Sequence, residues 1–123
     1  MKLYHYTTQK SFNQIEIDQL IKASEGKFGK GIYFTELSPK NGFRNLIKNN
    51  YNKIRGNNME KTERCFVFDM NLSSDCPFFR RVLNDKNTWI CQLDNGLPVH
   101  SVCAIDVATG RSMEFDRKAN KFL

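Results

Sequence analysis

The stretch Phe28-Gly29-Lys30-Gly31-Ile32-Tyr33-Phe34-Thr35 places two glycines around a lysine and then a run of β-branched and aromatic residues. Gly29 and Gly31 allow a sharp turn or the close approach of another group to the backbone. The residues Ile32-Tyr33-Phe34 are those that a short strand prefers. The stretch therefore predicts a glycine-kinked strand. Such a strand is either the floor of a site for a flat ligand or one arm of a hairpin that feeds the core.

The residues before this stretch predict a strand, a helix and a second strand. Lys2 to Tyr6 alternates two sets of side chains, as a strand does. Hydroxyl residues able to cap a helix follow, and apolar residues then recur at helical spacing. We expect a helix from about Gln9 to Glu16, a short strand around Leu20 to Ala23, and a loop over residues 24–27.

A second helix is predicted directly after the stretch. Ser38 supplies a hydroxyl for the N-cap, and Pro39 falls at the first helical position, where no amide hydrogen is missed. The apolar stripe that should continue this helix to about Arg55 consists of Phe43, Leu46, Ile47, Tyr51 and Ile54.

The second half of the chain reads as short strands joined by turns. Cys65 to Leu72 alternates apolar and mixed side chains, which predicts a strand with one apolar face. Residues 73–87 are irregular in pattern. Further strand and turn signals lie at residues 88–93, 94–96, 97–107, 109–110 and 112–115. We expect one α+β domain over residues 1–123, with two short helices and six or seven strands, mostly antiparallel.

The composition restricts the classes of function. A net charge of +6 favours phosphate-rich partners, although the basic residues are spread along the chain rather than gathered in one block. The four cysteines form no Cys-x-x-Cys pair and there are two histidines, so we expect no metal site and free thiols. The sequence shows no apolar run that would span a membrane and no signal peptide at its start, which predicts a cytoplasmic protein with no membrane partner.

Several nucleotide and hydrolase motifs are absent from the sequence. The Gly29-Lys30-Gly31 segment has neither the spacing of a dinucleotide-binding fingerprint nor that of a phosphate-binding loop. A nucleophile elbow does not occur either. His5, taken alone, is typical of a hydrogen-bonded structural residue.

The ordered set of motifs is more specific than any one of them. A Leu-Tyr-His-Tyr-Thr segment at residues 3–7 precedes the Gly-Lys-Gly-Ile-Tyr-Phe segment at residues 29–34. This order resembles the ADP-ribosyltransferase superfamily, including the poly(ADP-ribose) polymerase signature. It looks most like the small bacterial toxin-type transferases named for a His-Tyr-Asp triad. The resemblance implies an ADP-ribosyltransferase-like split of mostly antiparallel sheets, with NAD as the substrate.

The resemblance also implies roles for particular residues. His5 would bond the ribose on the adenine side of NAD, and Tyr33 would stack on the nicotinamide ring, so both side chains are expected to face one pocket. The other cofactor contacts implied by the resemblance are Tyr6, Thr7, Gly31, Phe34 and Phe43.

A carboxylate near the nicotinamide ribose completes the implied site. The polymerases place a glutamate at the start of a late strand, but the comparable segment here begins Asn87-Thr88-Trp89. The His-Tyr-Asp pattern instead favours an aspartate, and we expect Asp69 ahead of Asp85. Without the glutamate, transfer of a single ADP-ribose unit is expected rather than chain elongation.

Three functions remain open from the sequence. The first is mono-ADP-ribosylation of a protein or nucleic-acid acceptor by a cytoplasmic enzyme, or by one delivered into another cell and held in check by an immunity protein. The second is NAD hydrolysis on the same fold. The third is a nucleotide- or nucleic-acid-binding module without activity, which the missing glutamate and the charge of +6 would suit. An RNA 2′-phosphate transferase also uses NAD, but the sequence offers too few Arg and His motifs for it.

Overall fold

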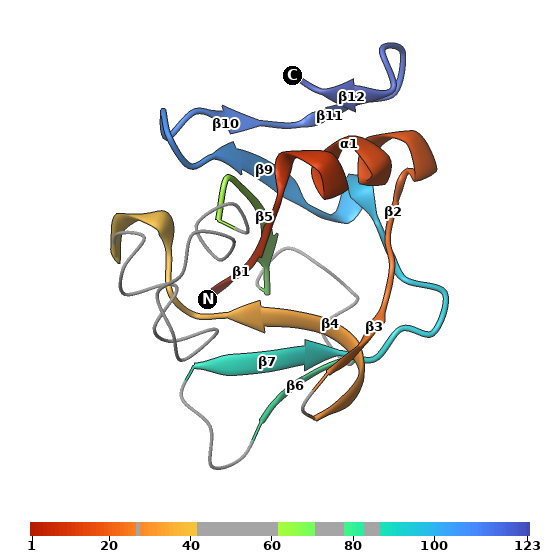
Figure 1. The fold of residues 1–123 in the computed structure, drawn as a ribbon, viewed down its shortest axis with the longest axis vertical. Coiled ribbons are helices and arrows are strands. Elements are labelled where there is room, and N and C mark those ends of the chain that lie inside the picture. Colours follow the sequence, from red (N-terminus) through yellow and green to blue (C-terminus); the bar gives the residue numbers. More distant parts are fainter. Residues whose placement is uncertain (27, 42–61, 71–77, 83–86) are drawn as a thin grey trace.

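The fold is taken from a computed structural model, which describes residues 1–26, 28–41, 62–70, 78–82 and 87–123. Within these ranges the chain forms one α-helix, two 3₁₀ segments and twelve short strands. The α+β class and the mostly antiparallel pairing expected from the sequence are therefore seen (Figure 1).

The elements follow one another in a simple order along the chain. The helical elements are α1 (Gln9–Asp18), η1 (Pro39–Asn41) and η3 (Val99–Ser101). The strands are β1 (Lys2–Thr7), β2 (Leu20–Ile21), β3 (Ser24–Gly26), β4 (Gly29–Thr35), β5 (Arg64–Asp69), β6 (Phe79–Arg81), β7 (Thr88–Cys91), β8 (Leu97–Pro98), β9 (Cys103–Asp106), β10 (Ser112–Met113), β11 (Phe115–Asp116) and β12 (Lys121–Phe122).

The main sheet runs in the order β10-β9-β5-β1-β4-β7-β6, with β3 paired to β4 as a side branch. All of its described pairings are antiparallel. β1 pairs with β5 over six positions, so that His5 lies opposite Phe66. The central strand β1 is thus held mainly by β5, and β4 lies on its other side.

The helix α1 covers one face of the sheet at β5. Thr8 caps its start by accepting a hydrogen bond from the Ser11 amide, and the chain leaves the helix at Gln19 with a left-handed φ of 55°. Phe12 is buried, and its ring stacks on that of Phe66 at 5.4 Å between centroids. Burial of this aromatic pair fixes α1 to the sheet.

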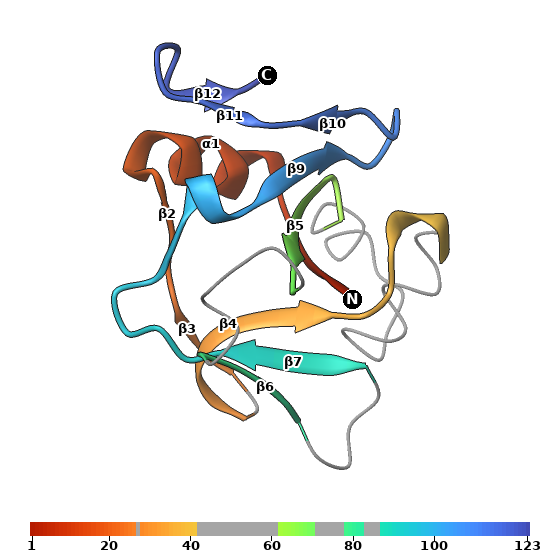
Figure 2. The same cartoon turned by 180° about the vertical axis from the view of Figure 1, so that it is seen from behind.

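The C-terminal hairpin β11–β12 lies beside α1 in both views (Figures 1 and 2). Its Phe122 ring lies 5.5 Å from that of Phe12 and from that of Phe66. The Phe122 amide donates to the Glu16 carboxylate at 2.8 Å. The hairpin therefore completes the apolar core from the far side of the helix.

The structure differs from the sequence-based expectations in its helices and in its shortest strands. The first helix extends two residues beyond the predicted end at Glu16. The predicted second helix begins as the 3₁₀ segment η1, and its continuation over residues 42–55 lies outside the described residues. The expectation of two short helices is thus not met in the described part, which has one.

The predicted strand over residues 97–107 is interrupted by η3, which ends where the Val102 backbone N–H donates a hydrogen bond to the Val99 carbonyl. Strands β3 and β6 lie in segments predicted to be loop or irregular, and β12 lies in a tail for which no strand was predicted.

Candidate active site

β1 and β4 are neighbouring strands of the main sheet. The two strands pair at Tyr4 and Thr35, whereas β4 pairs with β3 from Gly29 to Gly31. Between these two pairings a side chain reaches β4, since Nδ1 of His5 lies 2.7 Å from the Tyr33 carbonyl oxygen. A hydrogen bond therefore joins the side chain of His5 to the backbone of Tyr33, the two residues implied by the family resemblance.

This bond fixes the protonation of the His5 ring. A carbonyl oxygen can only accept a hydrogen bond, so Nδ1 carries the proton and donates it. Burial lowers the pKa of His5 below its ordinary value of 6.5, and the bond to the Tyr33 carbonyl opposes this shift only in part. The ring is thus neutral at pH 7, and its Nε2 atom is a hydrogen-bond acceptor.

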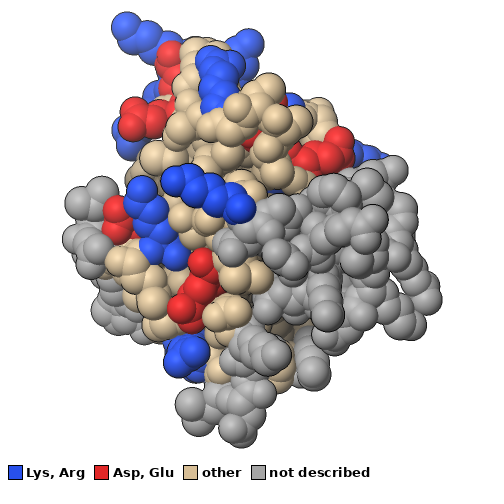
Figure 3. Space-filling view, turned by 90° about the vertical axis from the view of Figure 1, so that its left-hand side faces the viewer, with Lys and Arg blue, Asp and Glu red and all other residues tan. Residues whose placement is uncertain are grey.

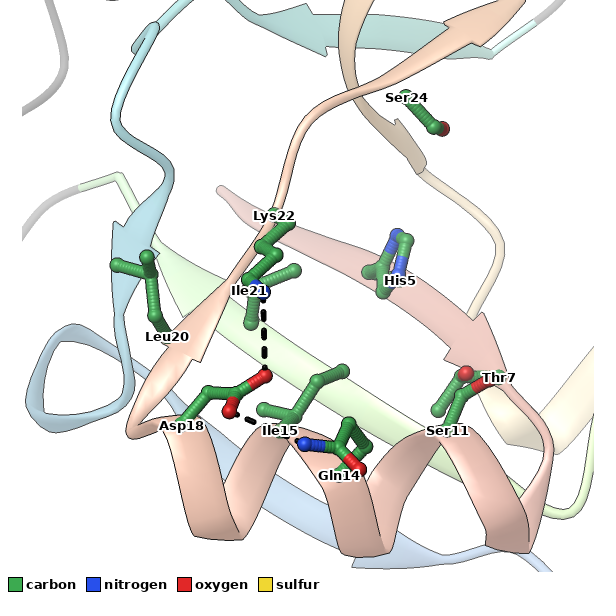
Figure 4. Close-up of a pocket in the computed structure, with 10 residues that line it drawn as sticks. All are labelled: His5, Thr7, Ser11, Gln14, Ile15, Asp18, Leu20, Ile21, Lys22 and Ser24. Carbon is green, nitrogen blue, oxygen red and sulfur yellow. Dashed lines mark hydrogen bonds and ion pairs between the residues drawn. The ribbon is translucent and has the colours of Figure 1, made fainter.

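The His5 ring borders a cleft of about 290 Å³ (Figure 4). β1, α1 and the chain from β2 to β3 supply its walls, and it is lined by His5, Thr7, Ser11, Gln14, Ile15, Asp18, Leu20, Ile21, Lys22 and Ser24. Behind the imidazole, the rings of Phe34 and Phe66 lie at 5.6 and 6.3 Å from it. The aromatic core therefore holds the imidazole from one side, while the cleft lies on the other.

The helix contributes a polar wall to this cleft. Gln14 donates from Nε2 to Oδ1 of Asp18 at 3.1 Å, and the Lys22 ammonium lies 3.4 Å from Oδ2 of the same carboxylate. Figure 4 shows this chain of contacts along one side of the cleft. Asp18 is thus bonded on both oxygens.

The Tyr33 side chain does not line this cleft. It alternates along β4 with Ile32 and Phe34, which belong to the core on the His5 face, so the ring leaves the sheet on the opposite face. Its hydroxyl accepts from the Phe28 amide at 2.8 Å and donates to the Gly29 carbonyl at 2.7 Å. The expectation that both side chains face one pocket is corrected: they meet through the Tyr33 backbone and lie on two faces of the sheet.

Two of the implied cofactor contacts have structural roles instead. Phe34 is 2% exposed and packs in the core against His5 and Phe79, so its ring is not available to a ligand. A Cβ atom on Gly31 would lie 2.4 Å from Cγ1 of Ile90, so the glycine is required by the packing of β4 against β7. Both assignments were implied by the family resemblance, which carries no information on how the strand packs in this chain.

The remaining predicted residues are placed as follows. Thr7 lines the cleft beside His5. The Tyr6 side chain is buried on the other face, where its hydroxyl donates to the Leu37 carbonyl at 2.9 Å. Phe43 and Asp85 lie outside the described residues.

Asp69 stands apart from both His5 and Tyr33. It ends β5 opposite Lys2, three positions from the level of His5. Because Tyr4 pairs with Thr35 in the antiparallel register, Tyr33 lies level with Tyr6. Asp69, level with Lys2, is therefore displaced from Tyr33 by four residues along the strand direction, or roughly 13 Å. The role of Asp69 beside the reacting ribose stays a prediction.

Sequence reasoning missed the polar wall of α1. Ser11, Gln14 and Asp18 are spaced three and four residues apart, which is the spacing of one helix face, and Lys22 lies beyond the end of the helix, after β2. The apolar stripe of the same helix was recognised. A polar stripe beside it was the available signal, but a solvated surface gives the same pattern.

Several chemistries receive no support from the described residues. Burial raises the pKa of the Cys65 thiol, and hydrogen bonds from Tyr6 and His5 oppose this shift only partly, which argues against a thiolate there. In the described ranges no three His, Cys, Asp or Glu side chains gather as a metal site requires. On the face in Figure 3, basic and acidic side chains are interspersed with uncharged ones. The described helix is too short and too polar to cross a membrane.

Comparison with models of known protein families assigns the chain to one family. The model of a family described as "HYD1 signature containing ADP-ribosyltransferase" matches residues 3–74, more than half of the chain. The matched range begins at β1 and includes α1, the cleft lining, β4 and β5. The chain is an ADP-ribosyltransferase domain. It belongs to the toxin-type family with the HYD1 signature. No curated protein and no solved structure matches it.

Proposed function

We propose that the protein is a mono-ADP-ribosyltransferase that cleaves NAD at the bond between nicotinamide and ribose. The observation that carries this proposal is the bond from Nδ1 of His5 to the Tyr33 carbonyl, beside a polar cleft and inside the range matched by the family. It links the two residues that the resemblance names and leaves Nε2 of His5 free of a proton.

His5 would bind the ribose on the adenine side of NAD. A neutral imidazole with its proton on Nδ1 accepts a ribose hydroxyl at Nε2, and Thr7 offers a second hydroxyl contact in the same cleft. The volume of about 290 Å³ lies just below the usual range of roughly 300–1,000 Å³ for ligand sites, which suits one nucleotide half rather than a whole dinucleotide.

Tyr33 would hold the nicotinamide half on the other face of the sheet. Its hydroxyl is occupied by two backbone groups and its ring already stacks on that of Phe28 at 6.5 Å between centroids, so a flat, partly cationic heterocycle would stack on the part of the ring that Phe28 leaves uncovered. The Tyr6 backbone would be a contact for the carboxamide. Phe43 stays a proposed second stacking ring.

The chemical step is a substitution at C1′ of the nicotinamide ribose. The C1′–N bond breaks with its electron pair going to nicotinamide, and the acceptor's nucleophile then bonds C1′ and loses its proton. A carboxylate near C1′ would stabilise the oxocarbenium-like transition state. Because of the offset of Asp69 along β5, Asp85 becomes the first aspartate to test, with Asp69 second.

The direct test incubates the protein and cell lysate with NAD labelled in its adenylate half. It measures the nicotinamide that is released and, separately, where the label goes. Transfer predicts label on a macromolecule, and digestion with protease or nuclease then identifies the class of acceptor. Free ADP-ribose with no labelled acceptor would instead indicate a hydrolase. Binding of NAD with no release of nicotinamide would indicate an inactive binding module and would refute the proposal.

The matched variants are His5→Ala and His100→Ala. His100 is the second histidine of the chain, and it is exposed in η3, away from the cleft lining. His5→Ala should abolish nicotinamide release, whereas His100→Ala should leave it unchanged. Equal rates for both variants would remove His5 from the site.

A further inference from the structure

Lys22 contributes a positively charged side chain to the wall of the cleft. Besides His5, which is neutral at pH 7, it is the basic residue among those that line the cleft. It follows β2 directly, and its side chain is 70% exposed. Its ammonium group is thus a positive charge at the border of a pocket that is otherwise neutral except for Asp18.

The position of this charge is set by α1. Oδ2 of Asp18 lies 3.4 Å from the Lys22 ammonium, while Oδ1 accepts the Gln14 amide at 3.1 Å. Asp18 therefore cannot turn away without breaking a second contact. An ammonium has three donors, and one carboxylate oxygen engages one of them.

The fold gains little from this ion pair. Exposed lysine–carboxylate pairs separated by four residues contribute slightly to stability, because water screens the charges. The pair belongs to the same cleft lining as His5 and Thr7 (Figure 4).

We propose that Lys22 binds the diphosphate of the dinucleotide, and that Asp18 and Gln14 are positioning residues that hold its ammonium at the cleft. This inference rests on the proposed function, because it takes NAD as the ligand. On this wall of the cleft, Lys22 is the cationic side chain that could bind the two negative charges of the diphosphate.

The test measures binding and turnover separately. Lys22→Gln should weaken the binding of ADP, measured by calorimetry, about fivefold to tenfold, and should leave the binding of adenosine unchanged. The KM for NAD should rise by a similar factor while kcat changes less than about twofold. Lys22→Arg should restore most of the affinity, because a guanidinium also binds phosphate.

Lys10→Gln is the matched control. Lys10 is an exposed lysine on α1 that does not line the cleft, so its replacement removes the same charge from the surface. It should change the ADP affinity less than about twofold. Equal effects of the two variants would show that only the net charge matters and would overturn the inference.

The positioning role of Asp18 has its own readout. If Asp18 acts through Lys22, Asp18→Asn should change the ADP affinity in the wild-type background and should have no effect in the Lys22→Gln background. An equal effect in both backgrounds would contradict a positioning role.

The two proposals fail differently. If ADP binding depends on Lys22 but no nicotinamide is released from NAD, the transferase proposal fails and the diphosphate site stands. If NAD is cleaved and Lys22→Gln alters neither ADP binding nor KM, the diphosphate site fails alone.

Discussion

The bond between His5 and the Tyr33 carbonyl predicts that stability and activity at position 5 can be separated. Asparagine places an amide N–H close to the position of Nδ1, but offers nothing at the position of Nε2. His5→Asn should therefore keep the bond to the carbonyl and lose the acceptor in the cleft. His5→Ala should lose both.

The size of the effect follows from the contacts of the ring. The bond is 2.7 Å long, and the loss of its donor leaves a carbonyl unpaired, which costs about 1–3 kcal/mol. Both variants also lose ring contacts with Phe34 and Phe66. The free energy of unfolding of His5→Ala should therefore lie about 1–3 kcal/mol below that of His5→Asn, and its Tm should be lower by roughly 3–6 °C per kcal/mol.

The pH dependence gives an independent check. Burial lowers the pKa of His5 in the folded protein below 6.5. In mildly acidic solution the imidazole is therefore protonated in the unfolded chain but stays neutral in the folded one. The free energy of unfolding should thus fall as the pH drops below 6.5, and this slope should be reduced in His5→Asn. Urea unfolding at a series of pH values measures it, with His100→Asn as the control.

Two results would refute this reasoning. Equal stability of the alanine and asparagine variants would show that the bond to the Tyr33 carbonyl does not hold the ring. Full nicotinamide release by His5→Asn would show that Nε2 has no part in binding the substrate.

Three further changes test the surroundings of the site. Gly31→Ala should lower the free energy of unfolding by about 1–3 kcal/mol, because its Cβ would lie 2.4 Å from Cγ1 of Ile90; the same change made in an Ile90→Ala background, which lacks that atom, should cost less in chemical denaturation. Tyr33→Phe keeps the ring but removes both hydroxyl contacts, so amide hydrogen exchange in the turn before β4 should accelerate while nicotinamide release persists. Glu36→Ala removes the carboxylate that accepts the Trp89 indole N–H at 3.0 Å, so the fluorescence of this one tryptophan should shift, and stability should fall by about 0.5–1.5 kcal/mol.

Elements defined by local signals could be predicted from the sequence. The start of α1 was predicted from hydroxyl caps, and Thr8 fills that role. The Gly-Lys-Gly-Ile-Tyr-Phe segment was predicted as a strand and forms β4. In both cases the decisive interactions lie within a few residues along the chain, so periodicity and composition contain the information.

Elements made by distant pairing could not be predicted in this way. β6 has three residues and exists because it pairs with β7, and β3 exists because the chain folds back onto β4. Such short strands have no alternation of their own to detect. The cleft lining has the same origin, since Lys22 borders it only because β2 follows the helix at this point.

The placement of Tyr33 shows most clearly what the sequence left out. A motif read along the chain gives the order of His5 and Tyr33, but not the face on which each side chain lies. The register of β1 and β4 places the two rings on opposite faces, while the bond from His5 to the Tyr33 carbonyl holds them at one level of the sheet. A ligand that touched only one face could contact one of these rings alone. A ligand that contacted both rings would therefore have to reach both faces of the sheet.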